Sequence, residues 1–277
     1  MNVQIVVGCG ETGGPLADLL EHSGRTVKRL DPIKGLDVTG LQASDEVDAM
    51  HVCIPWSGRF KETVAQYAHR FKPSIVIIHS TVPVGTTKEL KYVFGISIVH
   101  SPVRGMHATM ERDMKLYIKM IGYDDESDAG RAIAAMDGVF QLMKLKDSRT
   151  TELGKLLEQG RYGLNIAFAR EQNLICKELG LSYQSVVDEF IRTHNLGMEA
   201  RQSPDLRQQK VYPPEGPIGG HCVLPAMKTI SEQFQPFLLT LAYSQEAMIS
   251  KKNSDPMPLC AEQSFYTHPT AVVHPAD

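Results

Sequence analysis

The first half of the chain alternates short apolar runs, rich in valine and isoleucine, with amphipathic stretches. This alternation is typical of a parallel β-sheet covered by helices on both faces. We therefore expect an α/β domain with a doubly wound parallel sheet over residues 1–148. The expected strands are residues 3–7, 26–30, 49–54, 74–79, 96–100, 116–121 and 141–144.

The hydrophobic periodicity becomes helical from about residue 150 onwards. One helical pattern runs without interruption over residues 150–179, and shorter patterns follow at 183–194 and 226–251. We expect the sheet to be followed by a smaller all-helical domain over 149–252, with one long central helix. That helix is more apolar than a small domain can cover alone, which predicts a homodimer built around it.

Composition narrows the class of partner. The net charge of −3 favours neither nucleic acid nor an anionic membrane surface as a partner. No charged leader precedes the first strand, and no apolar run approaches the roughly 20 residues of a membrane span, so we expect a cytoplasmic protein that acts on a small molecule. The five scattered cysteines predict reduced thiols and no metal site. Residues 253–277, with four prolines and no periodicity, read as a polar tail.

A glycine-rich segment directly follows the first expected strand and opens a helix. Its sequence fits G-x-G-x-x-G, in which glycines allow a tight turn and a close approach of the backbone to a pyrophosphate. The helix N-terminus adds unpaired N–H groups and the positive end of its dipole. The segment predicts a dinucleotide site in a Rossmann-like domain, with the binding residues Gly8, Gly10, Glu11, Thr12 and Gly13.

The second expected strand ends in Asp31, about 20 residues after the glycine segment. A carboxylate here can accept hydrogen bonds from both ribose hydroxyls and repels a 2′-phosphate. NAD is therefore the predicted cofactor in preference to NADP. Arg29 and Lys34 lie nearby and would weaken that preference.

Four further segments of the chain form a recognisable set. They are His79-Ser80-Thr81-Val82-Pro83-Val84-Gly85-Thr86, Ser101-Pro102-Val103-Arg104-Gly105, the helix that begins Glu152-Leu153-Gly154-Lys155, and Gly219-Gly220-His221-Cys222. Together these segments resemble the UDP-glucose/GDP-mannose dehydrogenase family, lie in the family's order and cover the chain to about residue 250.

The resemblance implies a role for particular residues of these segments. It implies that Cys222 is the nucleophile and that Lys155 is catalytic, stabilising an oxyanion or lowering the pKa of the thiol. A thiolate can add to an aldehyde, and the thiohemiacetal can then be oxidised to a thioester that water cleaves. The resemblance also implies that Thr81 lies near the nicotinamide. We further expect Pro55 to contact the cofactor, and Arg104 could hold a phosphate or carboxylate of the substrate.

The chain departs from the family pattern at several positions. The glutamates of the family's S-P-E-F-x-R-E-G segment are absent from residues 101–107, and the asparagine that follows the family's lysine falls on Gln159. His107 or His221 could take over proton transfer, because imidazole titrates near neutral pH. The chain is also shorter than family members, whose further Rossmann-like domain grips the sugar nucleotide.

Three functions are compatible with these residues. The first is an NAD-dependent oxidation of a primary alcohol to a carboxylate through Cys222. The second is a two-electron oxidation with Lys155 as the acid/base, as in the distantly similar β-hydroxyacid dehydrogenases. The third is a non-catalytic NAD-binding protein. The number of NADH molecules formed per substrate separates the first two functions, and NAD binding without turnover identifies the third.

Overall fold

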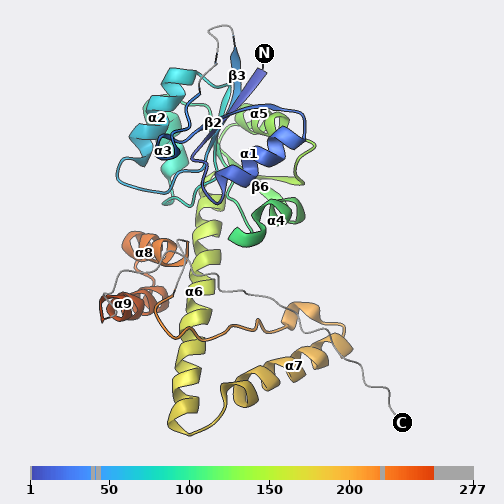
Figure 1. Cartoon of the computed structure of the whole chain (residues 1–277), viewed down its shortest axis with the longest axis vertical. Helices are drawn as coiled ribbons and strands as arrows, with labels where there is room; N and C mark the ends of the chain where they lie inside the picture. Colours follow the sequence, from blue (N-terminus) through green and yellow to red (C-terminus); the bar gives the residue numbers. More distant parts are fainter. Residues whose placement is uncertain (1, 39–40, 42–44, 219–221, 253–277) are drawn as a thin grey trace.

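The computed structural model describes residues 2–38, 41, 45–218 and 222–252 of the 277. A sheet domain is followed by a helical region built along one long helix (Figure 1). The predicted fold class, a Rossmann-like sheet followed by helices around a long central one, is confirmed. The predicted polar tail and His221 lie outside the described residues.

The sheet has seven strands among the described residues, in the order β2-β1-β3-β4-β5-β6-β7. The chain moves to one side of β1 for β2 and to the other side for β3, so the topological switch point lies between β1 and β3. Ligands of doubly wound sheets bind outside the carboxyl ends of the strands at such a point. The strands are β1 Asn2–Val7, β2 Thr26–Leu30, β3 Glu46–Val52, β4 Ile75–Ile78, β5 Ile98–His100, β6 Lys119–Tyr123 and β7 Leu142–Lys146.

One expectation about the sheet was wrong, because not all strands are parallel. Strand β6 pairs with β5 in the antiparallel sense, and β7 follows the direction of β6. An antiparallel neighbour starts at the end of the sheet where the preceding strand finishes, so the connection between them stays at that end. Residues 101–118, which carry Arg104 and His107, are therefore kept beside the carboxyl ends of the parallel strands.

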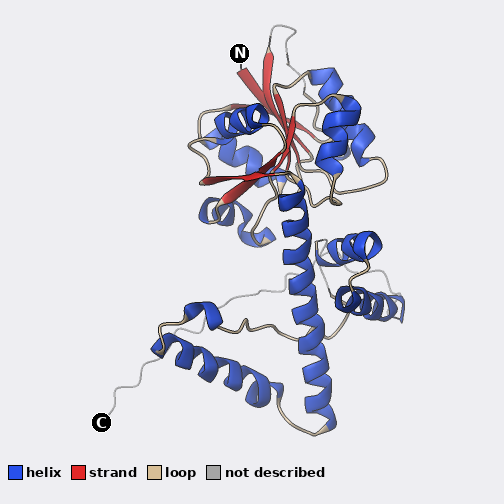
Figure 2. Ribbon diagram, turned by 180° about the vertical axis from the view of Figure 1, so that it is seen from behind, coloured by secondary structure: helices blue, strands red, loops and turns tan. Residues whose placement is uncertain are grey.

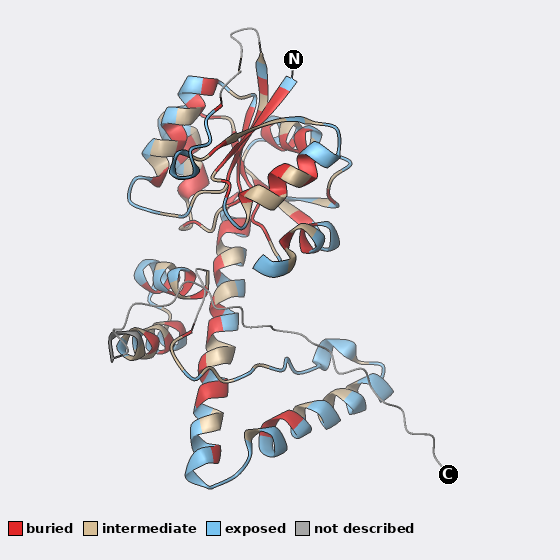
Figure 3. Ribbon diagram, in the orientation of Figure 1, coloured by how far each residue is buried: buried red, intermediate tan, exposed pale blue. Residues whose placement is uncertain are grey.

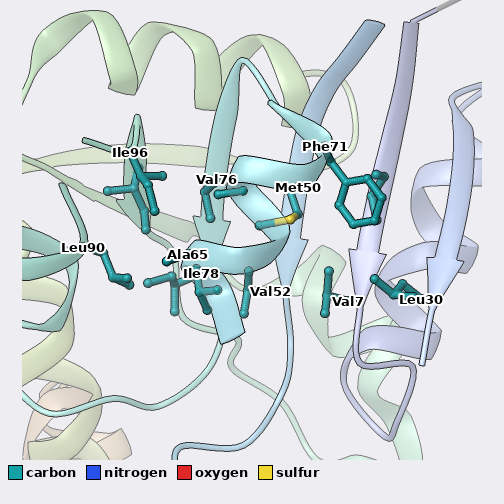
Figure 4. Packing of buried hydrophobic residues seen from close by; sticks show 14 of the residues in the cluster. Val7, Leu30, Met50, Val52, Ala65, Phe71, Val76, Ile78, Leu90 and Ile96 are labelled. Carbon is teal, nitrogen blue, oxygen red and sulfur yellow. The ribbon is translucent and has the colours of Figure 1, made fainter. Parts of the chain in front are cut away.

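Helices cover both faces of the sheet (Figure 2). On one face, side chains of α2 and α3 pack on apolar residues of the central strands, with Ala65 and Leu90 against Val52 and Ile78 (Figure 4). On the other face, Leu16 and other residues of α1 and α5 form a second apolar cluster. The helices are α1 Gly13–His22, α2 Phe60–Phe71, α3 Thr86–Phe94, α4 Met110–Leu116 and α5 Glu126–Met136.

The helical region contains the long helix at its predicted position. It is α6, Arg149–Glu178, and its first turn joins the sheet through Thr151, which bonds to His100 of β5. A π-helical turn, Gln184–Asp188, and α7, Glu189–Ala200, follow. The single helix predicted at 226–251 is instead two helices, α8 Val223–Phe234 and α9 Phe237–Lys252. The break falls at Gln235, which has φ 51° and precedes a proline, and a residue before proline is disfavoured in the α conformation.

Two glycines of α6 set how closely α8 and α9 approach it. A methyl group on Gly163 would meet Met227 of α8, and one on Gly160 would lie 3.0 Å from Leu239 of α9. These contacts belong to a third apolar cluster on that side of α6. Away from α8 and α9, much of α6 and α7 is exposed (Figure 3). Within the described part of the chain, no helix combines the length and apolarity needed to cross a membrane.

Candidate active site

The glycine segment forms a tight turn between β1 and α1, at the switch point of the sheet. Gly8 has φ 84°, and a methyl group on it would lie 2.9 Å from Ile54. A methyl group on Gly13 would collide with the carbonyl oxygen of Gly8, so this glycine allows the helix to start directly on the turn. Gly10 faces open space instead. Packing within the chain therefore explains the glycines at Gly8 and Gly13 but not the one at Gly10.

Asp31 lies at the end of β2, beside this turn. Its carboxylate accepts a hydrogen bond from the backbone N–H of Cys9 at 2.9 Å, and Lys34 donates to the carbonyl oxygen of Cys9 at 2.8 Å. Arg29 is held by Asp18 and by a second carboxylate on α1. Of the two cations expected to attract a 2′-phosphate, one is therefore neutralised within the chain and the other is bound to the glycine turn.

The loops after β3 and β4 carry Pro55 and Thr81 and are tied together. The Ser80 hydroxyl donates to the carbonyl oxygen of Ile54 at 2.6 Å. Glu152 on α6 is fully buried and accepts hydrogen bonds from the backbone N–H groups at the start of α3. These bonds hold the two predicted cofactor residues at the carboxyl end of the sheet, next to the first turn of the long helix.

Lys155 projects from the second turn of α6 and is nearly covered, with a side chain only 10% exposed. Its ammonium lies 3.7 Å from Glu158, which also binds Arg104 at 2.8 Å. Burial lowers the pKa of Lys155, and the charge of Glu158 partly opposes that effect. Gln159 follows on the next turn of α6. The predicted substrate ligand Arg104 is thus engaged in an ion pair beside the predicted catalytic lysine.

Cys222 immediately precedes α8, and its sulfur contacts another predicted site residue, His107. Its sulfur lies 3.3 Å from His107 Nε2, and His107 Nδ1 lies 2.9 Å from the carboxylate of Glu11. Burial raises the pKa of the Cys222 thiol, whereas the positive charge of Lys155 lowers it. The structure therefore gathers Glu11, His107, Lys155 and Cys222 from four separate segments.

The segment that leads to Cys222 is anchored by a buried ion pair between α6 and α9. Arg170 pairs with Glu246, and the two side chains also bind the backbone of the loop. The carbonyl oxygen of Gly216 accepts from Arg170 at 2.7 Å, and the N–H of Ile218 donates to Glu246 at 2.9 Å. Removing one partner of a buried pair costs several kcal/mol, about 3–5 in typical cases, so the pair gives a stable anchor for the backbone at Gly216 and Ile218.

Two residues around the site were not identified from the sequence. Glu158 links Lys155 to Arg104, and Lys119 of β6 is buried behind the segment that carries Arg104. The ammonium of Lys119 donates to the carbonyl oxygen of Ser101 at 2.9 Å, and burial lowers its pKa to about 7. A lysine within an interior strand was the available signal, because such a residue needs buried partners.

The chain is similar in sequence to several enzymes of known name. The UDP-N-acetyl-D-mannosamine dehydrogenase of Methanocaldococcus jannaschii is 28% identical over 265 residues, which cover 79% of this chain and 58% of the relative. The enzyme of the same name from Campylobacter jejuni is 28% identical over 170 residues, 55% of this chain and 39% of the relative. The chain is thus similar in sequence to enzymes named as nucleotide-sugar dehydrogenases. The resemblance predicted from the sequence motifs is confirmed, and no family model matches the chain.

Solved structures of similar fold include two kinds of dehydrogenase. The UDP-D-ManNAc dehydrogenase of Pyrococcus horikoshii superposes with a TM-score of 0.73 at 20% identity, over 91% of this chain and 69% of that one. The 3-hydroxyisobutyrate dehydrogenase of Mycobacterium tuberculosis superposes with a TM-score of 0.67 at 16% identity, over 92% of this chain and 96% of that one. The chain spans 58% of the length of the M. jannaschii relative and nearly all of the 3-hydroxyisobutyrate dehydrogenase.

Proposed function

We propose that the protein is an NAD-dependent dehydrogenase that oxidises the primary alcohol of a sugar nucleotide or a related small molecule to the carboxylate. The observation that carries the proposal is the gathering of Cys222, Lys155 and His107 next to a dinucleotide-type glycine turn. A thiol, a nearly buried amine and an imidazole are the groups that successive oxidation and thioester cleavage require.

The residues of the sheet domain fit a dinucleotide. Gly10 faces open space, so the backbone of the turn can be approached as closely as a pyrophosphate requires, and a side chain here would fill that space. Asp31 is placed for ribose hydroxyls, and the ion pairs of Arg29 favour NAD over NADP. Gly8, Glu11, Thr12, Gly13, Pro55 and Thr81 would complete this site. NAD held by these residues would supply the hydride acceptor for both oxidations.

The remaining steps fall to side chains of the site. Lys155, whose pKa burial lowers, takes the proton of the substrate hydroxyl. As an ammonium it then stabilises the oxyanion that forms when the sulfur of Cys222 adds to the aldehyde carbon. Oxidation of that thiohemiacetal leaves a thioester on Cys222, which water cleaves to the acid. Gln159 and His221 remain proposed members of this site, and Arg104 with its partner Glu158 would orient the substrate.

The proposal includes a homodimer, a cytoplasmic location and a substrate with a nucleotide portion. Phe168 of α6 is 64% exposed and Phe190 of α7 is 75% exposed, and both line a cleft of about 650 Å³ between the helices. A second copy of the chain would cover this apolar surface. The nucleotide-sugar class comes from the names of the relatives, which are longer than this chain.

The test measures NADH and acid formed from UDP-sugars, with sugars and hydroxyacids as further candidates. We expect two NADH per substrate and a burst followed by slower turnover, because the family's carboxylates near the thioester are missing. Cys222→Ala should retain slow aldehyde formation, and Lys155→Ala should lose both oxidations. Acid formation by Cys222→Ala at the wild-type rate would exclude the covalent route.

A second function is favoured by one comparison. The 3-hydroxyisobutyrate dehydrogenase of M. tuberculosis is covered almost end to end, which suits a two-electron oxidation that uses Lys155 alone. One NADH per hydroxyacid, unaffected by Cys222→Ala, would establish this function instead. NAD binding without turnover of any candidate would establish the non-catalytic alternative.

A further inference from the structure

Three side chains from distant parts of the chain contact one another in series, and the series ends at the sulfur of Cys222. A carboxylate oxygen of Glu11 lies 2.9 Å from His107 Nδ1, and His107 Nε2 lies 3.3 Å from the sulfur. An ionised carboxylate only accepts hydrogen bonds, so Nδ1 carries the hydrogen and Nε2 presents its lone pair to the thiol. The arrangement is that of a nucleophile, a base and a group that orients the base.

We propose that Glu11, His107 and Cys222 act as a nucleophilic triad. His107 is the general base, first for the thiol and then for the water that cleaves the acyl group from Cys222, and Glu11 is the residue that positions His107. This inference rests on the proposed function, since it supplies the base for the same covalent route. It assigns to Glu11, in the glycine turn, a role separate from cofactor binding.

The position of His107 is built by its own segment. Gly105 has φ 145°, and a methyl group on it would lie 2.8 Å from Asp113, so the chain can fold tightly against α4 only with a glycine here. The carboxylate of Asp113 accepts from the N–H of Met106 at 3.0 Å and from the Thr109 hydroxyl at 2.8 Å. These bonds hold the turn that carries His107, while the glycine turn holds Glu11.

The surroundings of Cys222 create the need for a base. Burial disfavours the thiolate, and the negative charge of Glu11 adds to that effect, so the pKa of the thiol is raised despite Lys155. Lys155 can attract a thiolate, but an ammonium cannot accept the proton that must leave the sulfur. His107 Nε2 is in contact with the sulfur and can accept it.

The chemical steps balance with water and with NAD, which the proposed function supplies as the hydride acceptor. As the sulfur–carbon bond forms and the carbonyl π bond opens to an oxyanion, the thiol proton moves to Nε2 of His107. The thiohemiacetal oxyanion would re-form its carbonyl as a hydride leaves to NAD, and Nε2 releases its proton to solvent. In the last step the neutral Nε2 takes a proton from water as the oxygen of the water adds to the thioester carbonyl. The carbon–sulfur bond then breaks, and the proton returns to the sulfur. Glu11 stays ionised throughout and stabilises the imidazolium.

The first experiment measures alkylation of Cys222 by iodoacetamide against pH, resolved by peptide mass spectrometry, without cofactor or substrate. We expect His107→Gln to lower the rate at pH 7 about tenfold, which corresponds to a change of about one unit in the thiol pKa. Glu11→Gln should lower it by a smaller factor: an amide can donate to Nδ1 and turn Nε2 into a donor, but loss of the negative charge favours the thiolate. Glu11→Asp should restore part of the rate.

Two further variants sharpen the result. The double variant Glu11→Gln/His107→Gln should be no slower than His107→Gln alone, because the two residues act as one unit. His22→Gln is the matched control, since His22, at the C-terminal end of α1, also faces a carboxylate, that of Glu111 at 3.8 Å. Alkylation of Cys222 at the wild-type rate in His107→Gln would overturn the triad. Alkylation at the wild-type rate in Glu11→Gln would overturn the role of Glu11. Both side chains are partly exposed, so neither change removes core packing.

The second experiment follows hydrolysis of p-nitrophenyl acetate, again without cofactor. Cys222 should release p-nitrophenolate, and His107→Gln should slow both acylation and deacylation tenfold or more. If no alcohol substrate reduces NAD but these effects hold, the proposed oxidation fails and the triad stands. If NADH and acid form, but the rates of alkylation and of ester hydrolysis in the His107 and Glu11 variants equal those of the wild type, the oxidation stands and the triad fails.

Discussion

The sheet domain and the helical region bury their side chains in different ways. In the sheet domain, helices from the same chain cover both faces, and even a buried polar side chain such as His100 has partners for both ring nitrogens. In the helical region, α8 and α9 cover only one side of α6, and Phe168 and Phe190 remain exposed. The first region is complete by its own packing, whereas the second offers an apolar surface for another molecule. The site lies where the two regions meet.

The largest expected effect breaks the packing of the helical region. Gly163→Val would drive a branched side chain into Met227 and Val223 of α8. We expect a loss of about 3 kcal/mol in the free energy of unfolding, the upper range for overpacking, and a melting temperature about 10 °C lower by calorimetry. Gly154→Val is the matched control, because Gly154 on the same helix faces open space. Equal losses in both variants would argue against the close approach of α8.

The next effect concerns the interior of the sheet domain. Burial lowers the pKa of His100 to about 3, below its value in the unfolded chain. The unfolded state therefore binds the proton more readily than the folded state. The free energy of unfolding is at its full value above about pH 6.5, where His100 is neutral in both states, and it decreases as the pH falls towards 3. We expect about 2 kcal/mol less stability at pH 5 than at pH 7.5 from His100 alone. His100→Gln should flatten the pH dependence measured by denaturant titration.

A third change tests the uncovered surface of α6. Phe168→Asp should weaken dimerisation at least tenfold, about 1.4 kcal/mol, because a charge would be desolvated in the interface. Light scattering at micromolar concentration would show a shift from dimer to monomer. Val93→Asp is the control, since this residue on α3 of the sheet domain is similarly exposed. A wild-type chain that is monomeric at that concentration would refute the homodimer.

The smallest effect concerns the cofactor preference of the sheet domain. Asp31→Ala should weaken NAD binding about tenfold, roughly 1.4 kcal/mol, by loss of the ribose acceptor, and should improve the affinity for NADP relative to NAD. Isothermal titration calorimetry would measure both affinities. Asp137→Ala, an exposed change beyond α5, serves as the control. An unchanged NAD affinity in Asp31→Ala would remove this assignment.

Much of the fold could be predicted because its signals are local. The strand boundaries of β2 and the extent of α6 follow from periodicity within a few neighbouring residues. The direction of β6 could not be predicted, because periodicity is the same for a strand running either way. The break at Gln235 was missed because an apolar pattern continues across it, although the following proline was a usable signal.

The candidate site divides in the same way. The sequence by itself determined the glycine turn, the acidic end of β2 and the order of the lysine and cysteine segments, since each depends on adjacent residues and on motif spacing. Only the tertiary structure decided that Glu11 meets His107, and that His107 meets a cysteine 115 positions further along the chain. The reason is that such contacts depend on how α4 and α8 are held against the sheet and the long helix. That placement is set by packing, by Gly105 and Gly163 and by buried partners such as Asp113, and not by local periodicity.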